Sequence, residues 1–157
     1  MLQPKHILTL VVLSSSLMSC VGEQRERPSP LRSDSTSFNS GIVKIEYSSP
    51  AVNEREIWGE LIPYGRMWRT GANDASYIST SIPIKVNGVA LDSGAYAIFT
   101  IPDEDRWEVI LNEKWNQWGT YQYDSTLNVA QFVVKPYKTK EFSERMKFYF
   151  ENDSLKF

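Results

Sequence analysis

Apolar and polar residues alternate along much of this chain, and a period of two predicts a succession of short β-strands. Residues 95–101 are apolar at nearly every position, which is typical of a central strand covered on both faces. At least seven short strands with hardly any helix predict an all-β fold, either an antiparallel β-sandwich or a jelly roll. The expected strands are residues 43–48, 76–81, 84–91 as a hairpin, 95–101, 107–111, 129–135 and 145–150.

Turn and capping signals add two local details to this pattern. Asn87 and Gly88 stand between alternating residues, and this pair accepts the positive φ angles of a type I′ hairpin turn. Asn53 stands three residues before Glu56, a spacing that resembles a capping box. We therefore expect one short helix after the first strand, ending near Glu60.

Two segments show neither a helix period nor a strand period, and both are rich in aromatic residues. Residues 57–73 contain two tryptophans, a tyrosine and two arginines, and residues 115–123 contain Trp118 at their centre. A connection this long and this apolar is expected to fold back onto the domain rather than extend into water. These segments are where we look for whatever is particular to the protein.

The N-terminal residues resemble a bacterial lipoprotein signal. A short basic start precedes an apolar run of only about a dozen residues, fewer than the roughly 17–25 that span a bilayer. Leu17 to Cys20 then fit the lipobox pattern of Leu, a variable residue, a small residue and Cys. The resemblance implies export through the Sec pathway, removal of residues 1–19 and acylation of Cys20. The alternative is an ordinary secretory signal in which Cys20 is incidental.

Acylation of Cys20 would anchor the protein in the bilayer of the cell envelope, at the outer membrane or on the periplasmic face. Residues 20–40 are polar, rich in Pro and Ser and without periodicity, so we expect them to form a disordered tether. Residues 41–157 are then the folded domain. Its length is enough for one domain with a core of its own.

Charge and the rarest residues exclude several classes of function. A formal net charge of −2 with both signs interspersed gives no basic face for a nucleic acid. The only histidine is His6 and the only cysteine is Cys20. Once the leader is removed, the domain lacks an imidazole, which argues against His- or Cys-based catalysis, a usual zinc site and an internal disulfide. We expect neither a metal nor a cofactor.

The irregular segments supply the candidate binding residues. Tryptophan and tyrosine offer stacking surfaces, arginine offers a fixed fork of donors, and such an inventory suits a sugar or a small carboxylate. The structural alternative is that Gly71 adopts a left-handed turn, Asn73 bonds nearby backbone and the aromatic residues belong to the core. The candidate ligand-binding residues are Tyr64, Arg66, Trp68, Arg69, Thr70, Asn73, Trp118 and Tyr121.

Catalysis by paired carboxylates is the enzymatic alternative. A glycoside hydrolase uses two such groups. The carboxylates available near the irregular segment are Glu54, Glu56, Glu60 and Asp74. The sequence has no Ser-His-Asp set, no phosphate-binding glycine loop and no dinucleotide fingerprint, so we name no catalytic residue.

Several strings of residues together resemble one bacterial family. These strings are Tyr47-Ser48-Ser49-Pro50, residues 59–65, Trp68-Arg69-Thr70-Gly71-Ala72-Asn73, Gly94-Ala95-Tyr96 and residues 118–121. The chain is similar over roughly residues 42–150 to the domain of unknown function DUF2911, although it carries Asp74 where that family more often has Glu. The resemblance implies a secreted or lipid-anchored envelope protein and no particular activity.

Taken together, the sequence favours a lipid-anchored envelope module that binds a glycan or a small molecule without catalysis. The alternatives are a carboxylate-based hydrolase of envelope glycans and a purely structural envelope protein. The lipid bilayer, reached through Cys20, is the expected partner.

Overall fold

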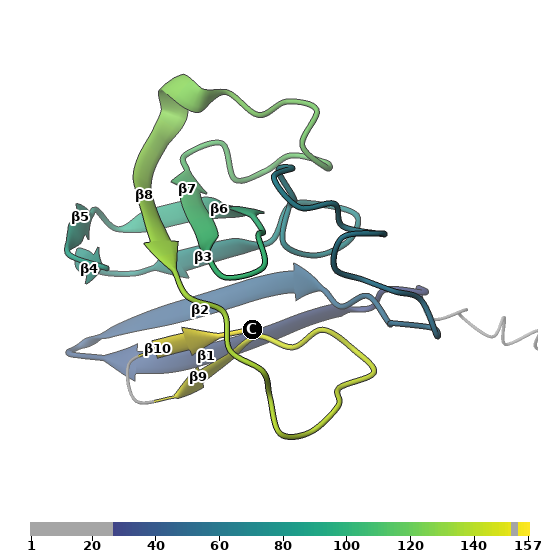
Figure 1. Ribbon diagram of the computed structural model, residues 1–157. Coiled ribbons are helices and arrows are strands. Elements are labelled where there is room, and N and C mark those ends of the chain that lie inside the picture. Colours follow the sequence, from purple (N-terminus) through teal and green to yellow (C-terminus); the bar gives the residue numbers. More distant parts are fainter. Residues whose placement is uncertain (1–26, 152–153) are drawn as a thin grey trace, which may run out of the picture.

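The structure, a computed structural model, describes residues 27–151 and 154–157 (Figure 1). Six strands form one antiparallel sheet in the order β1-β2-β3-β6-β7-β8, and two further pairs of strands form hairpins. The strands of the sheet are β1 (Leu31–Phe38), β2 (Gly41–Ser48), β3 (Tyr77–Thr80), β6 (Gly94–Ile101), β7 (Trp107–Asn112) and β8 (Asn128–Val134). The hairpins are β4 (Ile84–Val86) with β5 (Val89–Leu91), and β9 (Tyr149–Glu151) with β10 (Ser154–Lys156).

The all-β class and most of the predicted strands are confirmed. The alternating residues around Ile45 form β2, and the apolar run forms β6, in which Ala97, Ile98 and Phe99 are buried in the middle of the sheet. The predicted hairpin turns at Asn87 and Gly88, whose φ angles are 47° and 86°. Both values suit the type I′ turn that the sequence predicts.

The first strand is a correction to the expected tether. Residues 20–40 were expected to be disordered, but Leu31–Phe38 form β1, which pairs with β2 along its whole length. The side chains of β1 are exposed or half-buried, because the strand lies at the edge of the sheet and is held by backbone hydrogen bonds. A polar edge strand carries no hydrophobic period, so the alternation of apolar residues could not reveal it.

The predicted helix after the first strand is wrong. Asn53 and Glu54 have φ angles of 48° and 59°, which no right-handed helix accommodates. The Asn53 N–H donates instead to the Glu144 carboxylate, 2.9 Å away on a distant loop. Among the described residues, the one helical element is a 3₁₀ turn at Ser125–Leu127.

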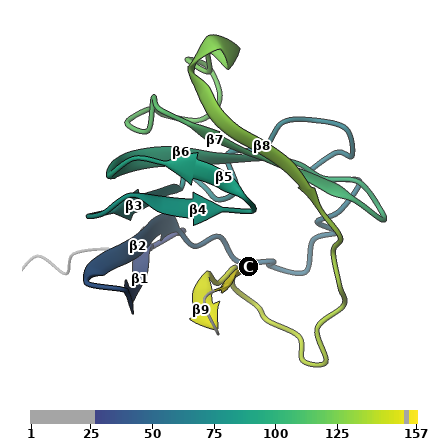
Figure 2. The ribbon, with the colours of Figure 1, turned by 90° about the vertical axis from the view of Figure 1, so that its left-hand side faces the viewer.

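The sandwich is not confirmed, because the described residues form one large sheet with only two hairpins opposite it. In Figure 1, β8 curves across the front of the sheet, and the chain beyond it descends toward β9 and β10. In Figure 2, β9 lies beneath β1 and β2. A backbone hydrogen bond of 3.0 Å from the Phe150 N–H to the Asp34 carboxylate joins this hairpin to β1.

The last predicted strand begins later than expected. Residues 145–150 keep their alternation, since Met146, Phe148 and Phe150 all pack on the core. The start of this stretch instead pairs with the chain just after β2, where the Met146 N–H donates to the Pro50 carbonyl at 3.0 Å. The regular strand is therefore limited to β9.

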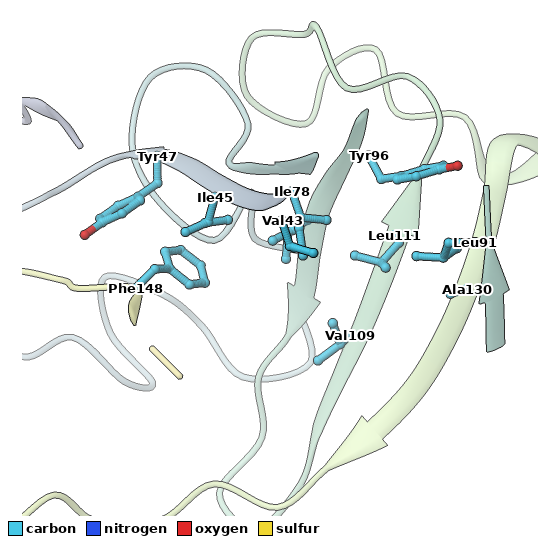
Figure 3. Packing of buried hydrophobic residues seen from close by; sticks show 11 residues of the cluster. Val43, Ile45, Tyr47, Ile78, Leu91, Tyr96, Val109, Leu111, Ala130 and Phe148 are labelled. Atoms are coloured by element: carbon cyan, nitrogen blue, oxygen red, sulfur yellow. The ribbon is translucent and has the colours of Figure 1, made fainter. Parts of the chain in front are cut away.

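The sheet carries a separate apolar cluster on each face. One face presents long side chains toward the hairpins, including Val43, Ile45, Ile78 and Leu111, with Phe148 packed against them (Figure 3). The other face is covered by the irregular segments and is built around Phe99 and small residues such as Ala97. We call these the hairpin face and the loop face.

Candidate functional site

The irregular segment 57–73 runs back along the sheet and extends it. Trp68 and Thr100 exchange two backbone hydrogen bonds of 2.7 and 2.9 Å, so this segment takes the place beside β6 that β3 leaves vacant. The expectation that the segment folds back onto the domain is confirmed. The backbone position of Trp68 is therefore fixed by hydrogen bonds to the sheet.

Thr70 is the most constrained of the candidate residues. It is fully buried, and its φ of 52° is an uncommon conformation for a β-branched residue. Its hydroxyl donates to the Ile98 carbonyl at 3.2 Å and lies 3.1 Å from the Thr100 hydroxyl. Ser76 donates to the Thr70 carbonyl at 2.8 Å, so these bonds hold the turn in its strained form.

Gly71 does not adopt the left-handed turn that the structural alternative assigned to it. The positive φ angles in this turn belong to Thr70 and Asn73. Gly71 is needed for space instead, because a Cβ atom there would lie 2.6 Å from the Ser76 hydroxyl and 3.2 Å from the Ser48 carbonyl. The turn is therefore close-packed on β2.

Trp68 belongs to a cluster of three tryptophans. Its ring centroid lies 5.8 Å from that of Trp58 and 6.4 Å from that of Trp107, with edge-to-face geometry in both pairs. Its indole N–H donates to the Gly71 carbonyl at 3.0 Å. The polar end of Trp68 is thus satisfied within its own turn, while its ring packs on other rings.

The two irregular segments meet at a second place. The Ala75 N–H donates to the Gln117 carbonyl at 2.9 Å, and the Gly119 N–H donates to the Asn73 carbonyl at 3.1 Å. Beyond this bridge, the rings of Trp118 and Tyr121 stack at 5.5 Å with an angle of only 7° between their planes. Their exposed fractions are 59% and 83%, so water covers this aromatic pair.

Arg69 is half-buried and lies within electrostatic range of Tyr121 and Asp74. Burial lowers the pKa of its guanidinium, while the charges of Tyr121 and Asp74 act in the opposite direction. Its buried Nε atom has no hydrogen-bond partner among the described residues. Trp118 and Tyr121 are therefore the candidate residues that the structure brings into contact, and Arg69 interacts electrostatically with Tyr121.

The remaining candidates lie elsewhere or only touch this group. Tyr64 and Arg66 are exposed on the turn before Trp68. The Asn73 amide reaches the Ser29 carbonyl at 3.5 Å, and its backbone carbonyl is the one that accepts from Gly119. The carboxylates considered for hydrolysis, Glu54, Glu56, Glu60 and Asp74, are all exposed.

The hairpin face contains a cavity that the sequence did not indicate. Its volume is about 640 Å³, and it lies between the curved sheet and the two hairpins. Side chains from distant parts of the chain line it, and most of them are apolar. Representative lining residues are Phe38, Val109, Phe132, Val134, Phe150 and Trp107.

Two members of the tryptophan cluster line this cavity, whereas Trp68 does not. Trp58 and Trp107 both line it, and their rings pack edge-to-face at 4.7 Å. Phe157 also lines it and lies 5.6 Å from the Trp107 ring. The only trace of this cavity in the sequence is the apolar side of each alternating strand. That pattern predicts which side chains face inward, but it does not predict an empty space between the elements.

The described residues limit two other interpretations. None of their His, Cys, Asp and Glu side chains forms a group of three or more that could hold a metal ion. Within residues 27–151 and 154–157, no helix is long and apolar enough to cross a membrane. His6 and Cys20 lie outside the described residues.

These features define an all-β domain with an apolar cavity on one face of its sheet and an exposed aromatic pair on the other side. Residues 29–156 match the model of the family described as "Protein of unknown function (DUF2911)", so the chain belongs to that family. The resemblance noted in the sequence is confirmed, over a longer stretch than expected. Neither the comparison with curated proteins nor that with solved structures finds a match.

Proposed function

We propose that this protein is a non-catalytic binding module of the cell envelope, and that its ligand is an apolar small molecule held in the cavity of the hairpin face. The cavity carries this proposal. Its volume of about 640 Å³ falls within the range of roughly 300–1,000 Å³ that is usual for ligand pockets. Ligand pockets are usually preformed and mostly apolar, and the lining of this cavity has that character.

The chemistry of the lining selects the kind of ligand. Aliphatic and aromatic side chains from both edges of the sheet face the space, and apolar cavities are poorly hydrated when empty. A ligand that removes apolar surface from water would therefore bind with a favourable hydrophobic contribution. An elongated apolar chain suits a space bounded by a curved sheet and two hairpins.

Binding of a neutral fluorophore tests this function. The full-length chain with Cys20→Ser, which removes the acylation site, is titrated with N-phenyl-1-naphthylamine, whose emission rises in apolar surroundings. We expect saturable binding at one site. Val134→Phe, which places a larger side chain in the cavity wall, should weaken it. The matched control is Val133→Phe, because Val133 neighbours Val134 on β8 but is 55% exposed. Equal loss in both variants, or no binding at all, would overturn the proposal.

A lipid anchor at Cys20 is part of the same proposal. The lipobox pattern of residues 17–20 supports it. We expect the natural chain to fractionate with membranes and the Cys20→Ser variant to appear in the soluble fraction. Identical fractionation of the two chains would count against acylation.

Glycan binding at the exposed aromatic pair is the second candidate function. The stacked and exposed rings of Trp118 and Tyr121 favour it, because exposed aromatic rings suit a sugar. Trp118→Ala is expected to abolish binding in a glycan array, with the melting temperature unchanged. Turnover of a glycan that disappears when Asp74 becomes Asn would instead support the hydrolase.

A further inference from the structure

The charged side chains that line the cavity among the described residues are all positive. Among the described residues that line it, Lys85, Lys135 and Lys156 are lysines, and none is an aspartate or a glutamate. The whole chain has a formal net charge of −2, so three cations without a carboxylate depart from its average. This asymmetry is the starting point for assigning the ligand's polar end.

Two of these lysines line the cavity together with one aromatic residue, Tyr137. Lys135 and Tyr137 follow β8, and the Lys156 ammonium lies 5.7 Å from the centroid of the Tyr137 ring. Lys135, Tyr137 and Lys156 all line the cavity, so its wall is basic where the end of β8 meets the β9–β10 hairpin.

The Lys135 and Lys156 ammonium groups have no anionic partner among the residues that the structure describes. Within the described part of the chain, neither Lys135 nor Lys156 is in an ion pair, whereas Lys44 pairs with Glu46 at 3.0 Å. The Asp34 carboxylate, on β1 beside Phe150, accepts the Phe150 N–H and is engaged there. Unpaired cations at the edge of an apolar cavity favour an anion that is attached to an apolar chain.

We propose that the cavity binds a single-chain anionic amphiphile, with its chain along the apolar lining and its headgroup at Lys135 and Lys156. This inference rests on the proposed function, because it names the ligand class of the same cavity. A carboxylate and a phosphate headgroup share the chemistry that two ammonium groups recognise. The apolar chain supplies most of the buried surface, and the lysines supply the preference for charge.

Four probes of equal chain length test this assignment in the full-length Cys20→Ser chain. Palmitate and hexadecyl phosphate carry an anionic head, hexadecanol is neutral, and hexadecylamine is cationic. Each competes against N-phenyl-1-naphthylamine below its micellar concentration. We expect the anionic probes to bind at least about 10-fold more tightly than hexadecanol, and hexadecylamine to bind most weakly. The two anionic probes show which headgroup is preferred.

The lysines are tested with a double variant and a matched control. Lys135→Gln with Lys156→Gln should weaken the anionic probes about 10-fold and leave hexadecanol unchanged. Lys138→Gln with Lys140→Gln removes the same charge from exposed positions that do not line the cavity, and it should change neither. An unchanged melting temperature of both variants shows that folding is intact.

The outcomes separate this inference from the function on which it rests. If hexadecanol competes as well as palmitate, or if the two double variants behave alike, the anionic assignment is wrong and the cavity function stands. If no probe binds and the neutral fluorophore also fails, the cavity function itself is wrong.

Discussion

The two faces of the sheet are covered in different ways, and the difference separates a structural interior from a candidate site. The loop face is close-packed around Phe99 and Ala97, both fully buried, and the segments that cover it are fixed to the sheet by backbone hydrogen bonds. The hairpin face is covered by two short hairpins and leaves a cavity of about 640 Å³. The cavity that we propose as the ligand site therefore lies on the hairpin face.

Removing the largest side chain of the loop face is expected to have the largest effect. Phe99 is fully buried and packs edge-to-face on Tyr123 at 5.1 Å. Phe99→Ala should lower the free energy of unfolding by about 3–5 kcal/mol, as large-to-small core changes do. Phe150→Ala, on the hairpin face, should cost clearly less because its side chain already borders a void. Urea unfolding measures both, and equal losses would contradict the comparison.

Enlarging a side chain should also have different effects on the free energy of unfolding at the two faces. Ala97→Leu adds volume where no space exists, and we expect a loss of about 1–3 kcal/mol from overpacking. Val134→Phe adds volume into the cavity and should leave the unfolding free energy within about 0.5 kcal/mol of the natural value. A large loss for Val134→Phe would mean that the cavity is already filled.

A smaller, pH-dependent effect is expected at the polar margin of the sheet. Tyr77 on β3 donates a hydrogen bond to Glu46 on β2, and burial followed by this bond raises the pKa of Tyr77 to about 12. Because the folded pKa exceeds the unfolded value, this contribution is complete below about pH 10 and is lost as pH rises through 12. Tyr77→Phe should cost about 1 kcal/mol at pH 8.

The dependence of stability on pH above about pH 10 tests the role of Tyr77. The natural chain should lose stability more steeply between about pH 10 and the folded pKa of about 12 than the Tyr77→Phe variant does. Urea unfolding at a series of pH values measures the two slopes. Parallel curves would show that the Tyr77 hydroxyl has the same pKa in both states.

The smallest effect is expected at Arg69. Its Nε atom is buried without a partner among the described residues, so Arg69→Met removes an unsatisfied group and keeps much of the stem. The free energy of unfolding should change by less than about 0.5 kcal/mol. A loss of several kcal/mol, measured by urea unfolding, would show that the guanidinium supports the fold rather than a ligand.

How far the sequence predicted the structure depends on what each element relies on. The strands that face the core alternate apolar and polar residues, so the sequence predicted β2 and the hairpin at Asn87. β1 relies on backbone pairing and has polar side chains, so no apolar period revealed it. The prediction of a helix near Asn53 was wrong because the Asn53 N–H, which a capping box would bond locally, donates instead to the Glu144 carboxylate.

The candidate site was predictable only in part for a related reason. Trp68 and Arg69 are neighbours in sequence, yet Trp68 packs with Trp107 at the cavity wall while Arg69 lies near Tyr121. The sequence identified the unusual segment but not the separation of its side chains. The cavity joins residues from β1 to β10 and depends on the curvature of the sheet, which no local pattern encodes.

The early start of β1 limits how far the domain can stand from a bilayer. The Pro30 carbonyl accepts the Ser49 N–H at 2.9 Å, so the chain is fixed to the sheet from that residue onward. Only nine residues, 21–29, separate it from Cys20, and fully extended they reach about 30 Å. An acylated Cys20 would thus keep the start of β1 within about 30 Å of the acylated residue. Any amphiphile leaving the adjacent leaflet would meet the protein within that distance.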